Sequence, residues 1–323
     1  MIEPDGSVAV LDLEPERADF LAEVLAGLSR SPRMLPCKFF YDARGADLFL
    51  KICELPEYYI TRTETEILRQ HGAEMAASIG SHAEIVGFGT GAGVKTRMLL
   101  QRLENPIAYV PVDISKERLS ESADALSRAM PELEILPVCA DYLQEFELPT
   151  PSRKPDHIAV LFPGSTIGNL EPAVARDFLR RVRRLCGRSG GLIIGVDLEK
   201  ARNVIEPAYN DRAGVTAEFN LNLLARANRE LGADFNLPCW FHRAVYNERE
   251  GRVEMYLISK VDQTVRVGGR EFRFATGERI ITEFSYKHSV PGFTALAVSA
   301  GFRRSRVWSD PRQFFAVFHF VVA

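Results

Sequence analysis

The 323-residue sequence has little of what marks disulfide-linked, metal-binding or membrane proteins. Its five cysteines are scattered without a CxxC pair, and its six histidines show no HxxxH spacing, so the sequence predicts neither a disulfide framework nor a metal site. No apolar run reaches the roughly 18 residues that a membrane-spanning helix needs. The stretch from Met1 to Leu13 carries acidic residues and lacks the basic start and apolar core of a signal peptide. We therefore expect a cytoplasmic protein with reduced thiols.

The sequence also lacks a large excess of either charge. Its net charge of −3 argues against a nucleic acid or an anionic membrane as partner. Hydrophobic residues make up 46% and charged residues 26%, as in soluble globular proteins, and the length allows one or two domains. Heptad repeats are absent, so a monomer is the default expectation.

A glycine-rich loop after a short apolar run is the most informative segment present. Four glycines alternate with other residues in this loop: Gly87, Gly89, Gly91 and Gly93. A helix-compatible run follows over residues 94–103. This pattern is typical of a strand that turns sharply into a helix with a ligand against bare backbone. Asp113 ends the next apolar run, about 20 residues on, where a carboxylate can bind ribose hydroxyls. A plain tight turn would show the same glycines, so a dinucleotide, S-adenosylmethionine and no ligand all stay open on this segment alone.

From residue 62 to about 198, short apolar runs alternate with amphipathic segments. We expect strands at 83–88, 107–112, 134–139, 157–162 and 192–196, and helices at 95–102, 116–129 and 173–185. This alternation predicts an α/β fold with a parallel sheet covered on both faces.

The last third of the chain has a different pattern. We expect strands at 252–260, 264–267, 271–274 and 280–286, with a Gly268-Gly269 turn, then a helix at 290–300 and strands at 303–308 and 313–322. The α/β core is thus predicted to be interrupted by an α+β insertion, with which we group the mostly helical N-terminal sixty residues.

Polar residues follow the predicted core strands, at the sheet edge where open α/β folds bind ligands. They are Lys95, Asp113, Asp141, the segment 162–169 with Ser165 and Thr166, and Asp197 with Glu199. Each has a plain interpretation as a cap or turn residue. Asp113 and Asp141 together fit ribose and the adenine amine, which favours S-adenosylmethionine. A dinucleotide stays open because Lys95 could reach a pyrophosphate.

Two further patterns concern a second ligand. Aromatic residues are dense between Lys38 and Tyr59, which is compatible with a binding site or with ordinary core. In the strand expected at 280–286, positions 281, 283 and 285 should share a face, so that Glu283 and Ser285 point the same way. A solvated strand face is the alternative interpretation of that pair.

These residues together resemble a known family, the S-adenosylmethionine-dependent histidine Nα-methyltransferases of ergothioneine biosynthesis. The resemblance runs from about residue 20 to the C-terminus and rests on six segments: 38–42 (KFFYD), 55–59 (LPEYY), 61–64 (TRTE), 95–100 (KTRMLL), 164–170 (GSTIGNL) and 213–220 (AGVTAEFN). It implies a Rossmann-like methyltransferase core over 62–198 plus 288–323. It also implies a second, α+β domain that binds the amino acid, over 9–61 plus 199–287. In the family reaction three methyl groups move in succession to the α-amino group of histidine, giving hercynine and S-adenosylhomocysteine.

The resemblance also implies roles for individual residues. The positions that would bind S-adenosylmethionine are Tyr58, Gly87, Gly89, Lys95, Asp113 and Asp141. Those that would bind L-histidine are Tyr41, Phe49, Thr166, Asn169, Tyr209, Met255, Glu283 and Ser285. Among them, Asn169 and Tyr209 would hold the carboxylate, and Glu283 and Ser285 the two imidazole nitrogens. Beyond the resemblance, we expect the hydroxyl of Tyr41 to orient the amine and pass its proton outward, and the ring of Phe49 to offer a face to the growing ammonium cation. The loop at 87–95 is longer and richer in glycine than the family pattern, which leaves the role of Lys95 open.

Three other functions compete with this hypothesis. An Nα-methyltransferase for another aromatic amino acid, such as a tryptophan derivative, would share the core, but an indole has only one polar nitrogen for Glu283 and Ser285. A NAD-dependent oxidoreductase would share the glycine loop, but no catalytic His or Tyr-Lys pair is evident at the predicted strand ends. A catalytically silent nucleoside-binding module would not need the amino-acid residues.

Overall fold

The computed structural model describes residues 8–13, 20–89 and 93–323. These residues form two compact units, each described by itself below. Unit 1 contains the described residues of 8–13, 63–198 and 288–323, and unit 2 contains 20–62 and 199–287. One helix, α3 (Tyr59–Ile79), contains the boundary at residues 62 and 63.

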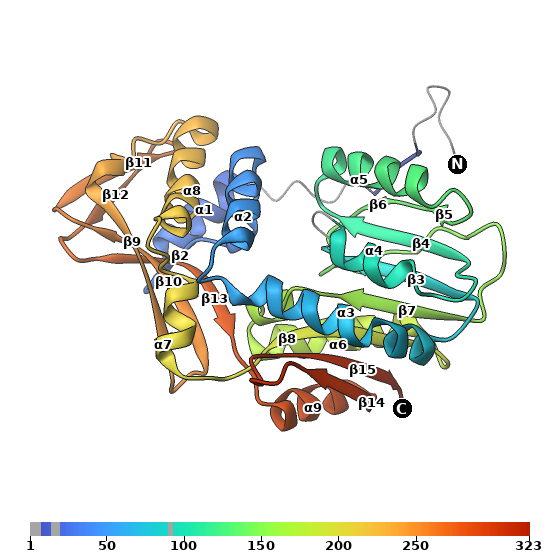
Figure 1. The fold of residues 1–323 in the computed structure, drawn as a ribbon. Coiled ribbons are helices and arrows are strands. Elements are labelled where there is room, and N and C mark those ends of the chain that lie inside the picture. The colour runs from blue at the N-terminus through green and yellow to red at the C-terminus, as the bar shows by residue number, and fades with distance from the viewer. Residues whose placement is uncertain (1–7, 14–19, 90–92) are drawn as a thin grey trace. The chain divides into compact units, whose positions relative to one another are not determined.

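Unit 1 is built on one large mixed sheet in the order β1-β6-β4-β3-β7-β8-β15-β14 (Figure 1). Its parallel strands are β3 (Ala83–Phe88), β4 (Ala108–Asp113), β6 (Val138–Cys139), β7 (His157–Phe162), β8 (Gly191–Asp197) and the short β1 (Leu11–Asp12). On one side, β15 (Phe315–Val322) runs antiparallel to β8, and β14 (Phe302–Ser309) runs antiparallel to β15. The short β5 (Glu134–Ile135) pairs with β4.

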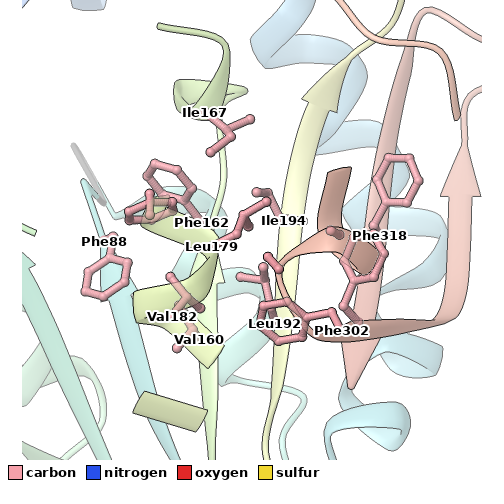
Figure 2. Close-up of a cluster of buried hydrophobic side chains, with 14 of the residues drawn as sticks. Phe88, Val160, Phe162, Ile167, Leu179, Val182, Leu192, Ile194, Phe302 and Phe318 are labelled. Atoms are coloured by element: carbon pink, nitrogen blue, oxygen red, sulfur yellow. The ribbon is translucent and has the colours of Figure 1, made fainter. Parts of the chain in front are cut away.

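Helices cover this sheet because its central strands are apolar on both faces. Every residue of β3 and β8 is buried, as the continuous apolar runs predict. The helices of unit 1 besides α3 are α4 (Val94–Leu100), α5 (Lys116–Ala129), α6 (Pro172–Cys186) and α9 (Val290–Ser299). In α6, Phe178, Leu179 and Val182 recur at helical spacing and pack with the side chains of β7 and β8 (Figure 2).

The order of the strands places a switch point beside β3. The chain leaves β3 for β4 on one side and later returns to β7 on the other. Loops after neighbouring parallel strands diverge at such a point, and the crevice between them is where open α/β sheets bind ligands. The fold therefore directs attention to the carboxyl ends of β3, β4, β6 and β7.

Unit 2 combines helices with a four-stranded sheet in the order β2-β13-β10-β9. The strands are β2 (Arg33–Met34), β13 (Arg279–Tyr286), β10 (Arg252–Ser259) and β9 (Trp240–Asn247). The helical segments are α1 (Phe20–Ser29), η1 (Cys37–Phe40), α2 (Ala43–Glu54), α7 (Arg202–Ile205), η3 (Glu206–Ala208), α8 (Val215–Leu231) and η4 (Leu237–Cys239).

The predicted turn at Gly268 and Gly269 is confirmed. It joins β11 (Gln263–Val267) to β12 (Arg270–Phe274) in an antiparallel hairpin of unit 2. Both glycines have positive φ, 53° and 78°, as a two-residue turn with left-handed backbone at both positions requires.

The strand expected at 134–139 is divided in the structure. Residues 134–135 form β5 and residues 138–139 form β6, with Leu136 and Pro137 between them. Leu136 and Ala140 donate to the carbonyls of Tyr109 and Asp113 in β4, so the ladder lacks a donor at Pro111 of β4, which has no backbone N–H to give to the Leu136 carbonyl. β6 then pairs on its outer side with β1, so residues 11–12 lie in the sheet of unit 1, whereas the range 9–61 expected for the second domain includes them.

The facing of β13 corrects one expectation. Met255 of β10 lies opposite Glu283, but the next residue, Tyr256, lies opposite Ile281, so Thr282 is an extra residue that forms a β-bulge. Ile281 consequently packs with Tyr256 and other side chains on the opposite face from Glu283. Strict alternation was wrong for position 281, because a bulge reverses the facing of the residues before it.

Candidate active site

The glycine loop follows β3 at the switch point. Gly87 lies within β3, in register with Pro111 of β4 and Leu161 of β7. Gly89 has a φ of 55°, and its N–H donates to the carbonyl of Val112 at 3.2 Å. That left-handed conformation favours glycine, because a side chain there is strained. Gly91 lies outside the described residues, and Gly93 precedes α4 with a φ of 67°.

Asp113 and Asp141 stand at neighbouring strand ends of unit 1. Asp113 is the last residue of β4, and its Oδ1 accepts from the N–H of Ser115 at 3.0 Å. Asp141 follows β6 by two residues, and its Oδ1 accepts from the N–H of Leu143 at 2.8 Å. The N–H of Ala140 donates to the Asp113 carbonyl at 3.0 Å, which ties the two ends together.

The chemistry of these two carboxylates fits a nucleoside. Burial raises the pKa of Asp113, and hydrogen bonds from the backbone N–H groups of Ser115 and Ile114 oppose that rise. An ionised carboxylate only accepts hydrogen bonds, whereas ribose hydroxyls and an adenine amine can donate them. The acceptors at β4 and β6, with the bare backbone at Gly89, thus suit the nucleoside part of S-adenosylmethionine.

Lys95, which the family resemblance places among the cofactor residues, is engaged by a buried carboxylate. Its Nζ donates to Glu64 of α3, whose exposed fraction is only 1%. The two carboxylate oxygens of Glu64 also accept from the N–H of Gly164, at 3.0 and 2.9 Å. Glu64 therefore connects α3, α4 and the loop after β7. Sequence reasoning did not single it out, although it ends the segment 61–64.

Gly195 of β8 leaves the space that the Glu64 carboxylate fills, since a Cβ there would lie 2.0 Å from Glu64 Oε1. We expect Gly195→Ala to lower the free energy of unfolding by about 1–3 kcal/mol, the usual cost of overpacking a core. Gly187→Ala is a suitable comparison, because a Cβ at that position meets nothing within 4 Å, although its positive φ adds strain of its own. Chemical denaturation of both variants measures the difference, and a Gly195→Ala variant as stable as wild type would contradict this packing.

The loop after β7 carries Thr166 and Asn169 in a single 3₁₀ turn, η2 (Thr166–Asn169). Ser165 precedes it with a φ of 59°, and its Oγ accepts from the N–H of Asp197 at 2.9 Å. Thr166 Oγ1 donates to the carbonyl of Pro163 at 3.2 Å. The end of β8 thus helps to hold this loop, which belongs to unit 1.

A connected group of aromatic rings in unit 2 includes five that we call the aromatic cluster: Tyr41, Phe49, Tyr58, Tyr209 and Phe219. Phe49 is central to it, with ring centroids 5.6 Å from Tyr41, 6.3 Å from Tyr58 and 6.2 Å from Phe219. Tyr58 in turn lies 6.4 Å from Tyr209. The Tyr41–Phe49 and Phe49–Tyr58 pairs are edge-to-face, and the face of an aromatic ring attracts a cation. Sequence reasoning did not identify Phe219, which lies in α8 within the segment 213–220.

The Tyr41 end of the cluster is fixed by the N-terminus of α2. Asp42 is the N-cap, and its Oδ1 accepts from the N–H of Gly45 at 2.7 Å and from Asn222 Nδ2 at 2.7 Å. Since Asn222 belongs to α8, this carboxylate ties the segment that carries Tyr41 to the helix that carries Phe219.

The Tyr209 end is held by His242 of β9. His242 Nε2 lies 2.7 Å from the carbonyl of Tyr209, and its Nδ1 lies 2.8 Å from Nδ2 of the fully buried Asn220. Burial lowers the pKa of His242. A neutral ring that donates from Nε2 and accepts at Nδ1 satisfies both contacts, so it fixes the backbone of Tyr209.

Glu283 and Ser285 lie on the same face of β13, opposite Met255 and Val253 of β10. Both side chains are buried, and Ser285 Oγ lies 2.9 Å from the hydroxyl of Tyr209. Burial raises the pKa of Glu283 to about 7, against a lowering by the charge of Lys287. The interpretation of the pair as a solvated strand face is therefore wrong, since little of either residue meets solvent.

The structure brings the predicted site residues together in two sets. Unit 1 holds Gly87, Gly89, Lys95, Asp113, Asp141, Thr166 and Asn169 at or near the strand ends. Unit 2 holds Tyr41, Phe49, Tyr58, Tyr209, Met255, Glu283 and Ser285. Over residues 8–13, 20–89 and 93–323, no helix is long and apolar enough to cross a membrane. No group of three or more metal-ligating side chains occurs within those same ranges.

Comparisons with known proteins point in the same direction as this geometry. The sequence profile of a family described as "Histidine-specific methyltransferase, SAM-dependent" matches residues 20–322. The chain is 41% identical to a histidine N-alpha-methyltransferase of Mycolicibacterium smegmatis, over 91% of this chain and 94% of the relative. It is 40% identical to the protein of that name in Mycobacterium tuberculosis, over 89% and 90%. It is also 32% identical to ergothioneine biosynthesis protein 1 of Neurospora crassa, over 86% of this chain and 32% of that longer protein. The chain belongs to the family of S-adenosylmethionine-dependent, histidine-specific methyltransferases.

Proposed function

We propose that the protein transfers three methyl groups from S-adenosylmethionine to the α-amino group of L-histidine, giving hercynine in ergothioneine biosynthesis. The observation that carries this proposal is the pair of hydrogen-bonding groups on β13, Glu283 and Ser285, which are buried on the same face of the strand. The hydroxyl of Tyr209 lies within hydrogen-bond distance of Ser285 Oγ. A neutral imidazole has one N–H donor and one acceptor nitrogen, which a carboxylate and a hydroxyl can satisfy together.

The remaining residues have roles in this proposal that follow from their chemistry. Asn169 and Tyr209 offer donors to the substrate carboxylate, and Asp113 and Asp141 accept from the ribose hydroxyls and the adenine amine. Tyr58, Gly87 and Gly89 are proposed to complete the cofactor site, and Lys95 to hold α4 beside it through its bond to Glu64. Met255 and Thr166 are proposed to border the amino acid. We also propose that the enzyme is a monomer and that it is located in the cytoplasm.

When bound, S-adenosylmethionine supplies an electrophilic methyl group. The protein must present the amine as a neutral nucleophile, about 3 Å from that carbon and in line with the bond that breaks. A free α-amino group is mostly protonated near neutral pH, so one proton has to leave the nitrogen before each of the three transfers, and the quaternary product carries none. Tyr41 is an exposed residue, and its hydroxyl is proposed to orient the amine and pass the proton outward.

Phe49 is proposed to stabilise the growing ammonium cation through its ring face. We expect Phe49→Leu to slow the second and third methylations more than the first, by about fivefold for a cation–π contribution near 1 kcal/mol. Single-turnover assays that start from histidine, Nα-methylhistidine and Nα,Nα-dimethylhistidine measure the three steps. Phe219→Leu removes a neighbouring ring of the same cluster and serves as the matched variant. An equal slowdown at all three steps would contradict a role in charge stabilisation.

Mass spectrometry of the reaction products tests the proposed function. The protein is incubated with S-adenosylmethionine and each amino acid in turn, and growth of the amino acid by three methylene units is expected for histidine. Trimethylation of tryptophan or tyrosine in preference to histidine would overturn the substrate assignment. Calorimetric titration with S-adenosylhomocysteine and with NAD separates a methyltransferase from an oxidoreductase, since binding of NAD alone would overturn the reaction class.

A further inference from the structure

Lys287 directly follows β13, contacts Ser285 and has no role in the scheme above. Its exposed fraction is 3%, and its backbone N–H donates to the carbonyl of Gly251 at 2.8 Å, which fixes the end of the strand. Its Nζ donates to the hydroxyl of Tyr209 at 2.7 Å and to Ser285 Oγ at 2.9 Å. A buried ammonium that contacts two predicted substrate residues is costly unless such contacts compensate it.

The ammonium of Lys287 and the hydroxyls of Tyr209 and Ser285 together determine which of these groups donates each hydrogen bond. Lys287 has only donors, so it occupies a lone pair on each of the two hydroxyl oxygens. The hydroxyls of Tyr209 and Ser285 also share a hydrogen bond of 2.9 Å. A phenol is the more acidic of the two and is the natural donor in that bond. Ser285 Oγ then accepts twice, from Lys287 and from Tyr209, and its own proton has to point elsewhere.

We propose that Lys287 is a positioning residue that makes Ser285 a hydrogen-bond donor toward the substrate ring and keeps Glu283 an ionised acceptor. This inference rests on the proposed histidine substrate. A donor and an acceptor side by side select the neutral imidazole in one tautomer, and an imidazolium, with two N–H groups, would face the Ser285 proton. The arrangement of Lys287, Ser285 and Glu283 therefore selects the charge state and the orientation of the ring.

The groups that face Glu283 define how the site responds to pH. The charge of Lys287 lowers the pKa of Glu283. Burial chiefly, and the charge of Glu283 in addition, raise the pKa of Cys37 in η1 and of Tyr58. Affinity for histidine should be lost as pH falls, because Glu283, with a pKa of about 7, and the ring of free histidine, with a pKa of about 6.5, then become protonated. Removing the Lys287 charge should raise the pKa of Glu283 and move this loss to higher pH.

Lys287→Met tests the inference, because it keeps the length of the side chain and removes its charge and donors. Histidine affinity is measured by calorimetry from about pH 6 to about pH 9 with S-adenosylhomocysteine present. We expect affinity near pH 7.5 to fall about tenfold or more and the midpoint of the pH profile to rise. Lys200→Met is the matched control, since Lys200 Nζ also donates to a tyrosine, Tyr59, at 2.8 Å within unit 2 but is not placed in the site. Its profile should follow wild type.

The contributions through Ser285 and Glu283 can be separated by double variants. In a Ser285→Ala background, Lys287→Met should still move the pH midpoint but cost less affinity. In a Glu283→Gln background it should no longer move the midpoint. A Lys287→Met protein with wild-type affinity and an unchanged midpoint would overturn the inference, and so would an affinity loss without any change in the pH profile.

Loss of S-adenosylhomocysteine binding would indicate that Lys287→Met does not fold. In that case a measurement on the wild-type protein tests the inference instead. Nitrogen NMR of bound, ¹⁵N-labelled histidine should show one protonated and one unprotonated ring nitrogen. Two protonated nitrogens would overturn the assignment of Ser285 as a donor. Absence of any histidine binding to wild type would overturn the proposed function and this inference with it, whereas binding with the wrong protonation pattern overturns only the inference.

Discussion

Replacing Glu283 with alanine should remove most of the preference for histidine over larger aromatic amino acids. The substitution deletes the acceptor for the ring N–H and enlarges the space beside Met255, its cross-strand neighbour. A buried group left without its partner costs about 1–3 kcal/mol, so kcat/KM for histidine should fall by about 10- to 100-fold. An indole or phenol side chain makes less use of this carboxylate and should lose less.

The measurement is the ratio of kcat/KM for histidine to that for tryptophan and tyrosine. Glu254→Ala is the matched control, because Glu254 is buried in the neighbouring strand β10 but points to the opposite face, where it accepts from Arg252 Nε at 2.8 Å. We expect Glu254→Ala to lower stability and leave the ratio unchanged. If the Glu283→Ala enzyme kept the wild-type ratio of kcat/KM values, another feature of the protein would determine the preference for the imidazole ring.

Much of unit 1 could be predicted from the sequence because its signals are local. Strands such as β3 and β7 are apolar runs that glycine or proline ends, and their predicted bounds match the structure. The alternation with helices predicts that the strands run parallel, so that the carboxyl ends carrying Asp113 and Asp141 lie at one edge of the sheet. The order of the strands was not predicted and comes from the structure. Residues that end strands are thus predictable together, even though each alone resembles a cap.

The features that could not be predicted depend on tertiary contacts. The bulge at Thr282 needs a partner strand to define it, and period-two reasoning therefore misplaced Ile281. β9 was not predicted, because its mixture of apolar, basic and polar residues is that of an edge strand. Lys287 follows a strand, where a lone lysine is ordinarily solvated, and only the fold shows that it is buried against Ser285.

The loop at 87–95 shows a different limit. Its glycine content indicates close approach of a ligand to the backbone, and Gly89 has the positive φ that this requires. Lys95, however, is paired with Glu64, and no sequence pattern indicated that a carboxylate 31 residues earlier would reach it. A charged residue in a ligand-binding loop can thus serve to hold the loop, which is a role that sequence spacing does not reveal.

Asp113→Asn should abolish most of the affinity for the cofactor. The asparagine keeps one acceptor oxygen but presents an amide N–H₂ to a ribose hydroxyl and removes the charge that strengthens both bonds. Hydrogen bonds to a charged group contribute about 1.5–3 kcal/mol each, so the Kd for S-adenosylhomocysteine should rise by about 100-fold. Calorimetry measures the Kd directly. Thermal unfolding gives an independent readout, because a ligand at about 100 times its Kd stabilises the folded state by about 2.7 kcal/mol, and the variant should lose most of that increment.

Asp156→Asn makes the same change at the other edge of the sheet. Asp156 immediately precedes β7, at its amino end, and its side chain is largely exposed beside His82. We expect this variant to bind S-adenosylhomocysteine as wild type does, so that the comparison isolates the carboxyl edge from the general effect of losing one negative charge. If the Asp113→Asn and Asp156→Asn variants bound S-adenosylhomocysteine with equal affinity, Asp113 at the end of β4 would not be hydrogen-bonded to the ribose. The nucleoside would then have to be held by Asp141 and the glycine loop, and Asp113 would be explained by its bond to the N–H of Ser115 as a strand-end cap.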